Sequence, residues 1–264
     1  MGGGGAEHDV SIMSGNEVMR NLDKNKYQIV EENPDIVFIA LHGKYGEDGQ
    51  IQKEFEDKGI RFTGSPSEVC KLGMDKIAFK KFAKKLGVVV AEDTIDVPCV
   101  VKPAQGGSSY GVSIVKDKND LKEAIEFAKK YDEKVIVEEY IEGVEVSCGV
   151  IGEGRALPVI EICPKTGFFD YESKYVIGKC EEIVPARISD EVTKKIQDIS
   201  SLIFKEMGCR GFARLDFIIK NNIPYLLEIN MIPGLTPNSL LPKEAREVGV
   251  SFGELLDLII QSSW

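Results

Sequence analysis

Side chains that could bind a divalent cation lie on two neighbouring predicted strands near the C-terminal end of the chain. The alternation of apolar and polar residues predicts strands over residues 213–219 and 225–230, with a turn over 220–224. The candidate cation ligands are Asp216, Glu228 and Asn230. Alternate residues of a strand point to the same face of a sheet, so Arg214 shares a face with Asp216.

A symmetric antiparallel hairpin would bring the candidate ligands together. Two carboxylates directly opposite each other repel, unless a cation lies between them. Oxygen ligands of this kind suit Mg²⁺, which keeps its other positions for water and substrate phosphates. The alternative interpretation is a solvated polar face on which Arg214 balances Asp216. The pairs expected to face each other are Ile219 with Tyr225, Asp216 with Glu228, and Arg214 with Asn230.

A glycine- and serine-rich segment follows a predicted apolar strand over residues 99–102. Backbone N–H groups of such a loop can surround phosphate oxygens, and Lys102 at the end of the strand would add a positive charge. The segment does not match the Walker pattern. The alternative interpretation is an ordinary turn. The residues of the loop are Gly106, Gly107, Ser108, Ser109 and Gly111.

An acidic pair, Glu138 and Glu139, leaves the apolar run 135–137. One of these carboxylates could accept a hydrogen bond from an adenine amino group, and Glu145 could accept one from a ribose hydroxyl. The alternative is ordinary exposed glutamates at the end of a strand.

Residues 168–182 mix aromatic and charged side chains without a helical or strand period, which is typical of a functional loop or lid. A surface loop that uses its aromatic residues for packing is the alternative. The two histidines, His8 and His42, lack the spacing of metal ligands, and the chain has no nucleophile elbow, so we reject a zinc site and a hydrolase triad.

Composition restricts the class of protein that these residues serve. The 264 residues include 33 Lys and Arg and 43 Asp and Glu, so the net charge of −10 argues against nucleic acid as the main partner. No apolar run approaches the about 20 residues that cross a bilayer, and no signal-peptide pattern is present. Six cysteines without CxxC spacing are expected to be reduced thiols. We therefore expect a cytoplasmic protein without a membrane partner.

The elements that must position these residues fall into three blocks, 1–64, 65–141 and 142–264, of class α/β or α+β. We expect a small α/β unit around a buried strand at 36–41, and no strand precedes Gly2, so a first strand is either missing or not needed. Further strands are expected at 99–102, 112–115, 135–139, 145–151 and 156–162. Helices are expected around residues 18–22, 51–58, 79–86, 121–128, 192–207 and 255–260.

Taken together, these motifs resemble D-alanine–D-alanine ligase, a family of ATP-grasp enzymes, in a form that lacks the first N-terminal strand. They follow the family order across nearly the whole chain. The matching stretches are 4–11 with 14–15, 40–43 with 46–49, 63–65, 74–76, 101–103 with 107–109, 169–171 with 174–175, 213–216, and 228–230 with 233–236 and 238–240.

The resemblance implies an ATP-grasp fold with the nucleotide between the central block, 65–141, and the C-terminal block, 142–264. It also implies a homodimer, two D-alanine molecules and ATP as ligands, and two Mg²⁺ ions, with Mn²⁺ as a substitute. The residues that match ATP-binding positions are Lys76, Lys102, Ser108, Ser109, Glu138, Glu139, Ile141, Glu145 and Lys174.

The family's other site positions also have matches. Glu7, Ser108 and Tyr175 match the set that orients the first D-alanine, and Arg214 matches a catalytic position. Asp216, Glu228 and Asn230 match the metal site, while His42, Gly234, Ser239 and Leu240 match positions around the amino acids. The implied activity is ATP-dependent formation of D-alanyl-D-alanine through an acyl phosphate, for peptidoglycan precursors. Alternatives are a ligase with another acceptor, such as a D-hydroxy acid, and a non-catalytic nucleotide-binding homologue.

Overall fold

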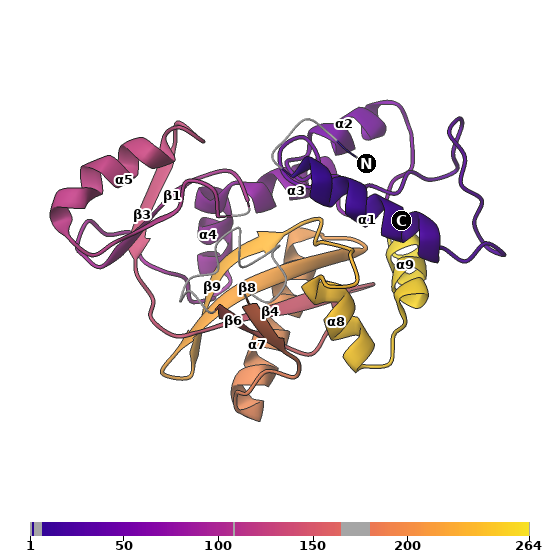
Figure 1. Ribbon diagram of the computed structural model, residues 1–264. Helices are drawn as coiled ribbons and strands as arrows, with labels where there is room; N and C mark the ends of the chain where they lie inside the picture. The colour runs from indigo at the N-terminus through magenta and orange to yellow at the C-terminus, as the bar shows by residue number, and fades with distance from the viewer. Residues whose placement is uncertain (1, 3–6, 108, 165–179, 264) are drawn as a thin grey trace.

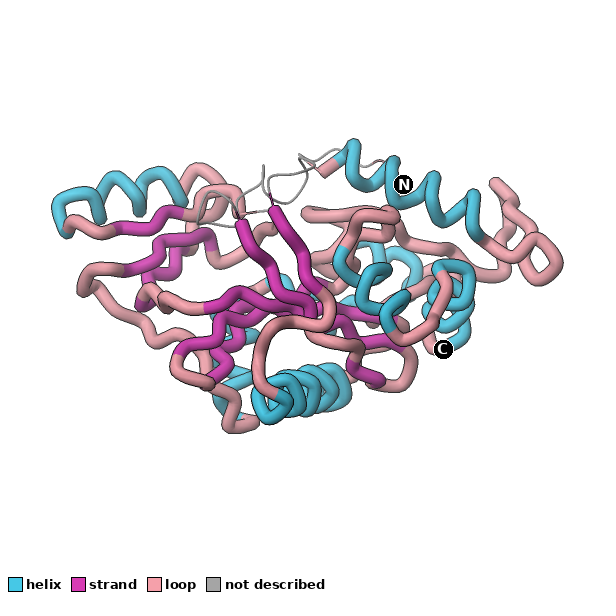
Figure 2. Tube along the Cα trace, turned by 60° about the horizontal axis from the view of Figure 1, so that its bottom comes forward, coloured by secondary structure: helices cyan, strands magenta, loops and turns pink. Residues whose placement is uncertain are grey.

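Two antiparallel sheets hold the candidate cation ligands and the Lys102 and Glu138 side chains. A computed structural model describes residues 2, 7–107, 109–164 and 180–263. A three-stranded sheet lies with α5 at one end of the molecule, and a larger sheet occupies the centre, with α8 and α9 at the other end (Figures 1 and 2). This mixed architecture agrees with the predicted α/β or α+β class.

The larger sheet has six strands in the order β7-β6-β4-β8-β9, and the short β5 pairs with β4 outside this path. Figure 1 shows the long helix α7 below this sheet and α1 and α2 above it, while α3 packs into the same apolar core as α7. The strands are β4 (Val144–Ile151), β5 (Arg155–Ala156), β6 (Ile160–Pro164), β7 (Cys180–Ile183), β8 (Phe212–Lys220) and β9 (Ile223–Asn230).

Eight α-helices are described in residues 7–107, 109–164 and 180–263. Side chains of α3, α4 and α7 share one apolar core with β4, β8 and β9, whereas α1, α8 and α9 contribute to a second core. The helices are α1 (His8–Asn21), α2 (Gln50–Asp57), α3 (Ser67–Met74), α4 (Lys76–Lys85), α5 (Leu121–Ala128), α7 (Asp190–Met207), α8 (Leu240–Glu247) and α9 (Phe252–Gln261).

The smaller sheet consists of β1 (Cys99–Pro103), β2 (Ser113–Val115) and β3 (Val135–Glu139), in the order β2-β1-β3. Apolar side chains on one face pack against α5, which follows the 3-10 turn η1 (Lys118–Asp120). Because side chains alternate along a strand, Lys102 of β1 and Glu138 of β3 project from the face away from α5.

The β8–β9 hairpin has the predicted pairing at the candidate ligands but not at its tip. Asp216 faces Glu228, and Arg214 faces Asn230. The prediction that Ile219 faces Tyr225 is wrong, because Ile219 faces Pro224. The turn contains two residues rather than five, Asn221 and Asn222, both with positive φ. A bulge between the Asp216 and Phe217 pairs then shifts the register by one residue and restores the predicted pairing.

The strand expected at residues 36–41 is not formed. Val37 makes one isolated parallel bridge with Phe62, supported by backbone hydrogen bonds to residues 61 and 63. The ladder stops there because the next donor, the N–H of Ile39, bonds to the Thr63 side chain at 3.0 Å instead of a backbone carbonyl. Ile39 and Ala40 are buried, but the segment has no continuous partner strand.

Most other predicted elements are present within a few residues of their expected ends, but the strand predicted at 156–162 is two strands, β5 and β6, and the helix predicted at 18–22 begins at His8. The α3 and α8 helices were not predicted, and β7 occupies residues 180–183, so the end of the proposed lid segment is strand. Residues 165–179 lie outside the described residues. All six cysteines are free thiols, which confirms that prediction. Within the described ranges, no helix combines the length and apolar character needed to cross a bilayer. The block boundaries 64 and 141 stay predictions.

Candidate active site

Three neighbouring strands, β4, β8 and β9, present polar side chains on one face of the larger sheet. Their other face is apolar and packs into the core with α3, α4 and α7. The strand register places Ser147 opposite Asp216 and Gly149 opposite Arg214. The residues that alternate onto the polar face are Glu145, Ser147, Gly149, Arg214, Asp216, Glu228 and Asn230.

Arg214 and Asp216 form a buried, bidentate ion pair on this face. The guanidinium Nε and Nη2 donate to the two carboxylate oxygens at 2.8 Å each, and the side chains are only 12% and 10% exposed. The Ser147 hydroxyl also donates to Asp216. This pair is the contact proposed as the alternative to a metal site, and it fixes the direction in which both groups point.

The side chains on this face fit a divalent cation. The Asn230 Oδ1 is buried and has no hydrogen-bond partner within the described part of the chain, which leaves a buried oxygen available as a ligand. Glu228 lies two residue pairs along the hairpin from Asn230, on the same face, and Lys76 Nζ is 3.4 Å from Glu228 Oε2. Among the described residues, no group of three or more His, Cys, Asp or Glu side chains could hold a metal ion. A cation bound at this face would therefore need the amide oxygen of Asn230 as its third ligand.

Two buried lysines from different elements make ion pairs, Lys76 with Glu228 on this face and Lys102 with Glu138 on the smaller sheet. Lys76 begins α4, is largely buried, and donates to the carbonyl of Gly106 in the glycine-rich loop. It therefore joins that loop to Glu228. Lys102 Nζ lies 2.5 Å from Glu138 Oε1 on the smaller sheet. Burial alone would raise the pKa of Glu138, but Lys102 and Lys80 outweigh it and hold the pKa below its ordinary value.

Glu7 brings the N-terminal helix to the glycine-rich loop. It is the residue before α1, and its carbonyl accepts the N–H of Ser11 at 3.0 Å. Its carboxylate is so close to Gly43 that a Cβ there would lie 1.8 Å from Oε2. A Cβ on Gly107 would lie 3.5 Å from Oε1. The carboxylate thus lies between the segment of Gly43 and the glycine-rich loop at Gly107.

We expect Gly43→Ala to displace Glu7 and to raise the KM for an amino-acid substrate at least about tenfold. Gly43 has φ 73, where an L-residue costs about 1–2 kcal/mol, and the new Cβ would also collide with the carboxylate. Gly59→Ala is the matched control, because Gly59 has φ 66 with no atom within 4 Å of its Cβ position. Steady-state kinetics and thermal melts of both variants test this. Equal KM changes in the two variants would contradict it.

His42 belongs to a buried hydrogen-bond network between the N-terminal segment and the loop after β9. Its Nδ1 contacts the carbonyl of Ile232 and its Nε2 the hydroxyl of Ser14, both at 2.9 Å. The backbone N–H of His42 donates to Ser11 Oγ at 2.9 Å. Burial lowers the pKa of His42 to about 4, with a smaller contribution from Arg214, so the ring is neutral at pH 7.

Glu47 joins the same two segments and had no role assigned from the sequence. Its carboxylate accepts the N–H of Gly43 at 2.6 Å and the N–H of Ile232 at 3.1 Å. Burial raises its pKa to about 8, and the charge of Glu7 adds to the shift. Its place within the matching stretch 46–49 was the signal in the sequence.

The loop that follows β9 leads to three predicted substrate residues. Leu235 N–H donates to Ser14 Oγ at 3.3 Å, so this loop is tied to α1. A Cβ on Gly234 would lie 2.7 Å from Ser239 Oγ. Ser239 precedes α8, and its hydroxyl accepts the N–H of Thr236 at 3.1 Å. Leu240 packs in an apolar cluster with Ile160 and Ile162.

Glu244 of α8 is fully buried beside the polar face. Both of its oxygens accept the N–H of Gly149 at 3.1 Å, and a Cβ on Gly149 would lie 2.5 Å from Oε2. Burial raises the pKa of Glu244 to about 8, against the opposing effects of the Gly149 N–H and the Arg214 charge. Nothing in the sequence pattern distinguished this glutamate from exposed ones.

We expect Glu244→Gln to flatten the pH dependence of stability. The ordinary pKa is 4.5, so between pH 4.5 and 8 the folded chain holds a proton that the unfolded chain releases. The free energy of unfolding therefore falls as the pH rises through this range, by on the order of a few kcal/mol from this group. Urea unfolding at pH 5.5 and pH 8 measures the slope, with the exposed Glu247→Gln as control. An unchanged slope in Glu244→Gln would contradict the expectation.

The remaining predicted residues are placed as follows. Glu139 turns towards residue 92, whose N–H it accepts at 3.1 Å, and Ile141 is buried. Glu145 lies on the polar face of β4, and Ser109 has φ 59 in the glycine-rich loop. Ser108, Lys174 and Tyr175 lie outside the described residues.

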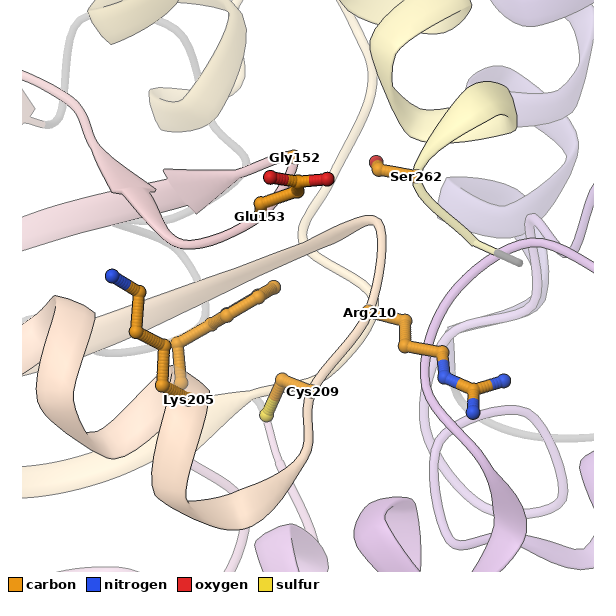
Figure 3. A pocket seen from close by; sticks show the side chains of 7 residues that line it. Gly152, Glu153, Lys205, Cys209, Arg210 and Ser262 are labelled. Carbon is orange, nitrogen blue, oxygen red and sulfur yellow. The ribbon is translucent and has the colours of Figure 1, made fainter.

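A pocket of about 330 Å³ lies away from these residues (Figure 3). Its lining comes from the β4–β5 turn, the end of α7, the segment between α7 and β8, and the residue after α9, and none of the predicted site residues contributes. The lining residues are Gly152, Glu153, Phe204, Lys205, Cys209, Arg210 and Ser262.

Comparison with known proteins identifies the family. The family model described as "D-ala D-ala ligase C-terminus" matches residues 72–261, and the one described as "D-ala D-ala ligase N-terminus" matches residues 30–65. The D-alanine–D-alanine ligase A of Bacillus cereus is 40% identical, over 98% of this chain and 94% of the relative. The chain belongs to the D-alanine–D-alanine ligase family. A further relative, the D-alanine–D-alanine ligase of Clostridium botulinum, is 37% identical over 100% of this chain and 96% of its own length.

Solved structures of the D-alanine–D-alanine ligase family have the same fold. The Bacillus anthracis D-alanine–D-alanine ligase complexed with ATP gives a TM-score of 0.87 at 37% identity, over 100% of this chain and 94% of that one. The VanG D-Ala:D-Ser ligase of Enterococcus faecalis gives a TM-score of 0.89 at 31% identity, over 99% of this chain and 97% of that one. These matches confirm the predicted resemblance, fold class and ligase assignment.

Proposed function

We propose that this chain joins two D-alanine molecules to D-alanyl-D-alanine in an ATP-dependent reaction, as a step towards peptidoglycan precursors. The observation that carries the proposal is the polar face of β4, β8 and β9, where Arg214, Asp216, Glu228 and Asn230 meet Lys76 from α4. The full-length similarity to D-alanine–D-alanine ligases supports it.

The first step activates a poor electrophile. The carboxylate of the first D-alanine attacks the γ-phosphorus of ATP, which releases ADP and forms an acyl phosphate. Lysines reduce the charge repulsion during the transfer. We assign Lys76, Lys102, Ser108, Ser109 and Lys174 to the phosphates, Glu138, Glu139, Ile141 and Glu145 to the nucleoside, and Glu7, Ser108 and Tyr175 to the first D-alanine.

The second step forms the peptide bond. The amine of the second D-alanine attacks the acyl carbonyl, phosphate leaves, and the attacking nitrogen loses its proton. We assign Arg214 and the backbone N–H of Gly234 to the oxygen that becomes negative, with His42, Ser239 and Leu240 around the amino acids. The neutral His42 ring, fixed between α1 and the Ile232 carbonyl, keeps these segments in place without adding a charge.

Asp216, Glu228 and Asn230 would hold Mg²⁺, with the unpartnered Asn230 Oδ1 as the observation that supports this. Bound there, Mg²⁺ would supply positive charge to the phosphate oxygens. We also propose that the protein acts in the cytoplasm as a homodimer.

A screen of D-amino and D-hydroxy acids tests the function. We expect phosphate release from ATP to require D-alanine and Mg²⁺, and mass spectrometry to identify D-alanyl-D-alanine as the product. Product formation with D-lactate but not D-alanine as the second substrate would overturn the specificity. No phosphate release with any acceptor would favour a nucleotide-binding protein without catalysis.

A further inference from the structure

Lys80 is a buried lysine of α4 that the proposed reaction does not use. Its Nζ lies 2.9 Å from Glu138 Oε2 and 2.9 Å from Asp93 Oδ1. The side chains of Lys80 and Glu138 are 9% and 5% exposed, whereas that of Asp93 is 81% exposed. Since Lys102 occupies the other oxygen of Glu138, this carboxylate lies between two ammonium groups.

The two lysines bound to Glu138 have different surroundings. Lys102 is on the same small sheet as Glu138, on the strand that leads into the glycine-rich loop. Lys80 comes from α4, whose Phe79 and Ala83 are packed in the core of the larger sheet. Lys80 also lies four residues after Lys76, and therefore on the same side of α4. It connects the helix that carries one proposed phosphate ligand to the residue proposed to bind adenine.

We propose that Lys80 is a positioning residue that holds the Glu138 carboxylate ionised and correctly oriented for the adenine 6-amino group. The inference rests on the proposed function for the assignment of Glu138 to adenine. Phosphate oxygens compete with Glu138 for Lys102. When Lys102 turns to them, one oxygen of Glu138 becomes free to accept from adenine, and Lys80 keeps the other.

Charge and burial explain why Lys102 alone would not keep Glu138 ionised and available to adenine. A buried carboxylate without a counter-ion is costly, so without Lys80 it would retain Lys102 or take up a proton. Either outcome weakens nucleotide binding, and protonation also removes the preference for a hydrogen-bond donor at position 6 of the purine. The lowered pKa of Glu138 agrees with a permanently charged group.

The test compares ATP with inosine triphosphate, which has an acceptor oxygen at position 6 where ATP has a donor. We expect the unaltered chain to prefer ATP at least about tenfold in kcat/KM. Lys80→Met should reduce this preference about tenfold, by lowering kcat/KM for ATP while kcat/KM for inosine triphosphate stays unchanged. Lys80→Arg should restore the preference. Lys84→Met is the matched control, because Lys84 lies one turn further along α4 in an exposed pair with Glu92. If Lys80→Met does not fold, Lys80→Gln replaces it.

Calorimetric binding of ADP and inosine diphosphate, without amino acid, separates this inference from the proposed function. A chain that binds ADP with a Lys80-dependent preference but forms no dipeptide would support the role of Lys80 and refute the ligase activity. Loss of melting temperature in Lys80→Met with an unchanged purine preference would overturn the inference. So would an unaltered chain that binds both diphosphates equally.

Discussion

Glu228→Gln is expected to lower kcat for dipeptide formation by at least about a thousandfold while the chain remains folded. Glu228 faces Asp216 across the hairpin and lies 3.4 Å from Lys76, so it is part of both the proposed cation site and the phosphate contacts. Loss of its charge removes several kcal/mol of stabilisation from the transferring phosphoryl group. The Glu228 side chain is 31% exposed, so its charge is partly solvated. We therefore expect the chain to fold when this charge is removed.

Phosphate release at a series of Mg²⁺ concentrations, with thermal melts in parallel, measures this effect. Glu206→Gln, on the exposed side of α7, is the control and should keep full activity. Retained Mg²⁺-dependent turnover in Glu228→Gln would refute the cation assignment. Asp216→Asn is a less clean test, because it would leave the buried Arg214 without its partner at a cost of about 3–5 kcal/mol.

Arg214→Lys is expected to lower kcat by about a hundred- to a thousandfold, the range found when one oxyanion donor is removed. The planar guanidinium makes two parallel contacts with Asp216 at 2.8 Å, and a lysine ammonium cannot reproduce this fork. Because lysine keeps the positive charge, the loss of kcat would measure the effect of hydrogen-bond geometry rather than the effect of charge.

Arg187→Lys is the matched control for this substitution. Arg187 makes the same kind of bidentate pair, with Glu161, but its side chain is 62% exposed. We expect that variant to keep kcat within about twofold, since neither Arg187 nor Glu161 is among the residues assigned to the reaction. A fall in kcat of less than tenfold in Arg214→Lys would contradict the oxyanion role.

The pairing of the candidate ligands was predictable, although the turn length from which it was predicted was wrong. The sequence suggested a five-residue turn, whereas Asn221 and Asn222 alone form it. The extra residue in β9 at the bulge compensates for the difference, so Asp216 still faces Glu228. Side-chain alternation specifies which residues share a face, but a bulge has no reliable signal in an apolar run.

Contacts between distant segments could not be predicted. The apolar run at 36–41 has the composition of a strand, but whether it pairs depends on its neighbour, and Thr63 ends that pairing. The partners of Glu138 show the same limit, because Lys80 is 58 residues away in the sequence. Burial gives Glu47 and Glu244 their raised pKa values, and a single sequence does not report the burial of a glutamate.

The bulge in β9 also separates the hairpin tip from the residues that we propose to bind the substrates. Asn221 and Asn222 are exposed, and the bulge lies between them and the Asp216–Glu228 pair. A peptide epitope or a fluorescent label introduced at Asn221–Asn222 would therefore report on the protein without changing the alignment of its catalytic end.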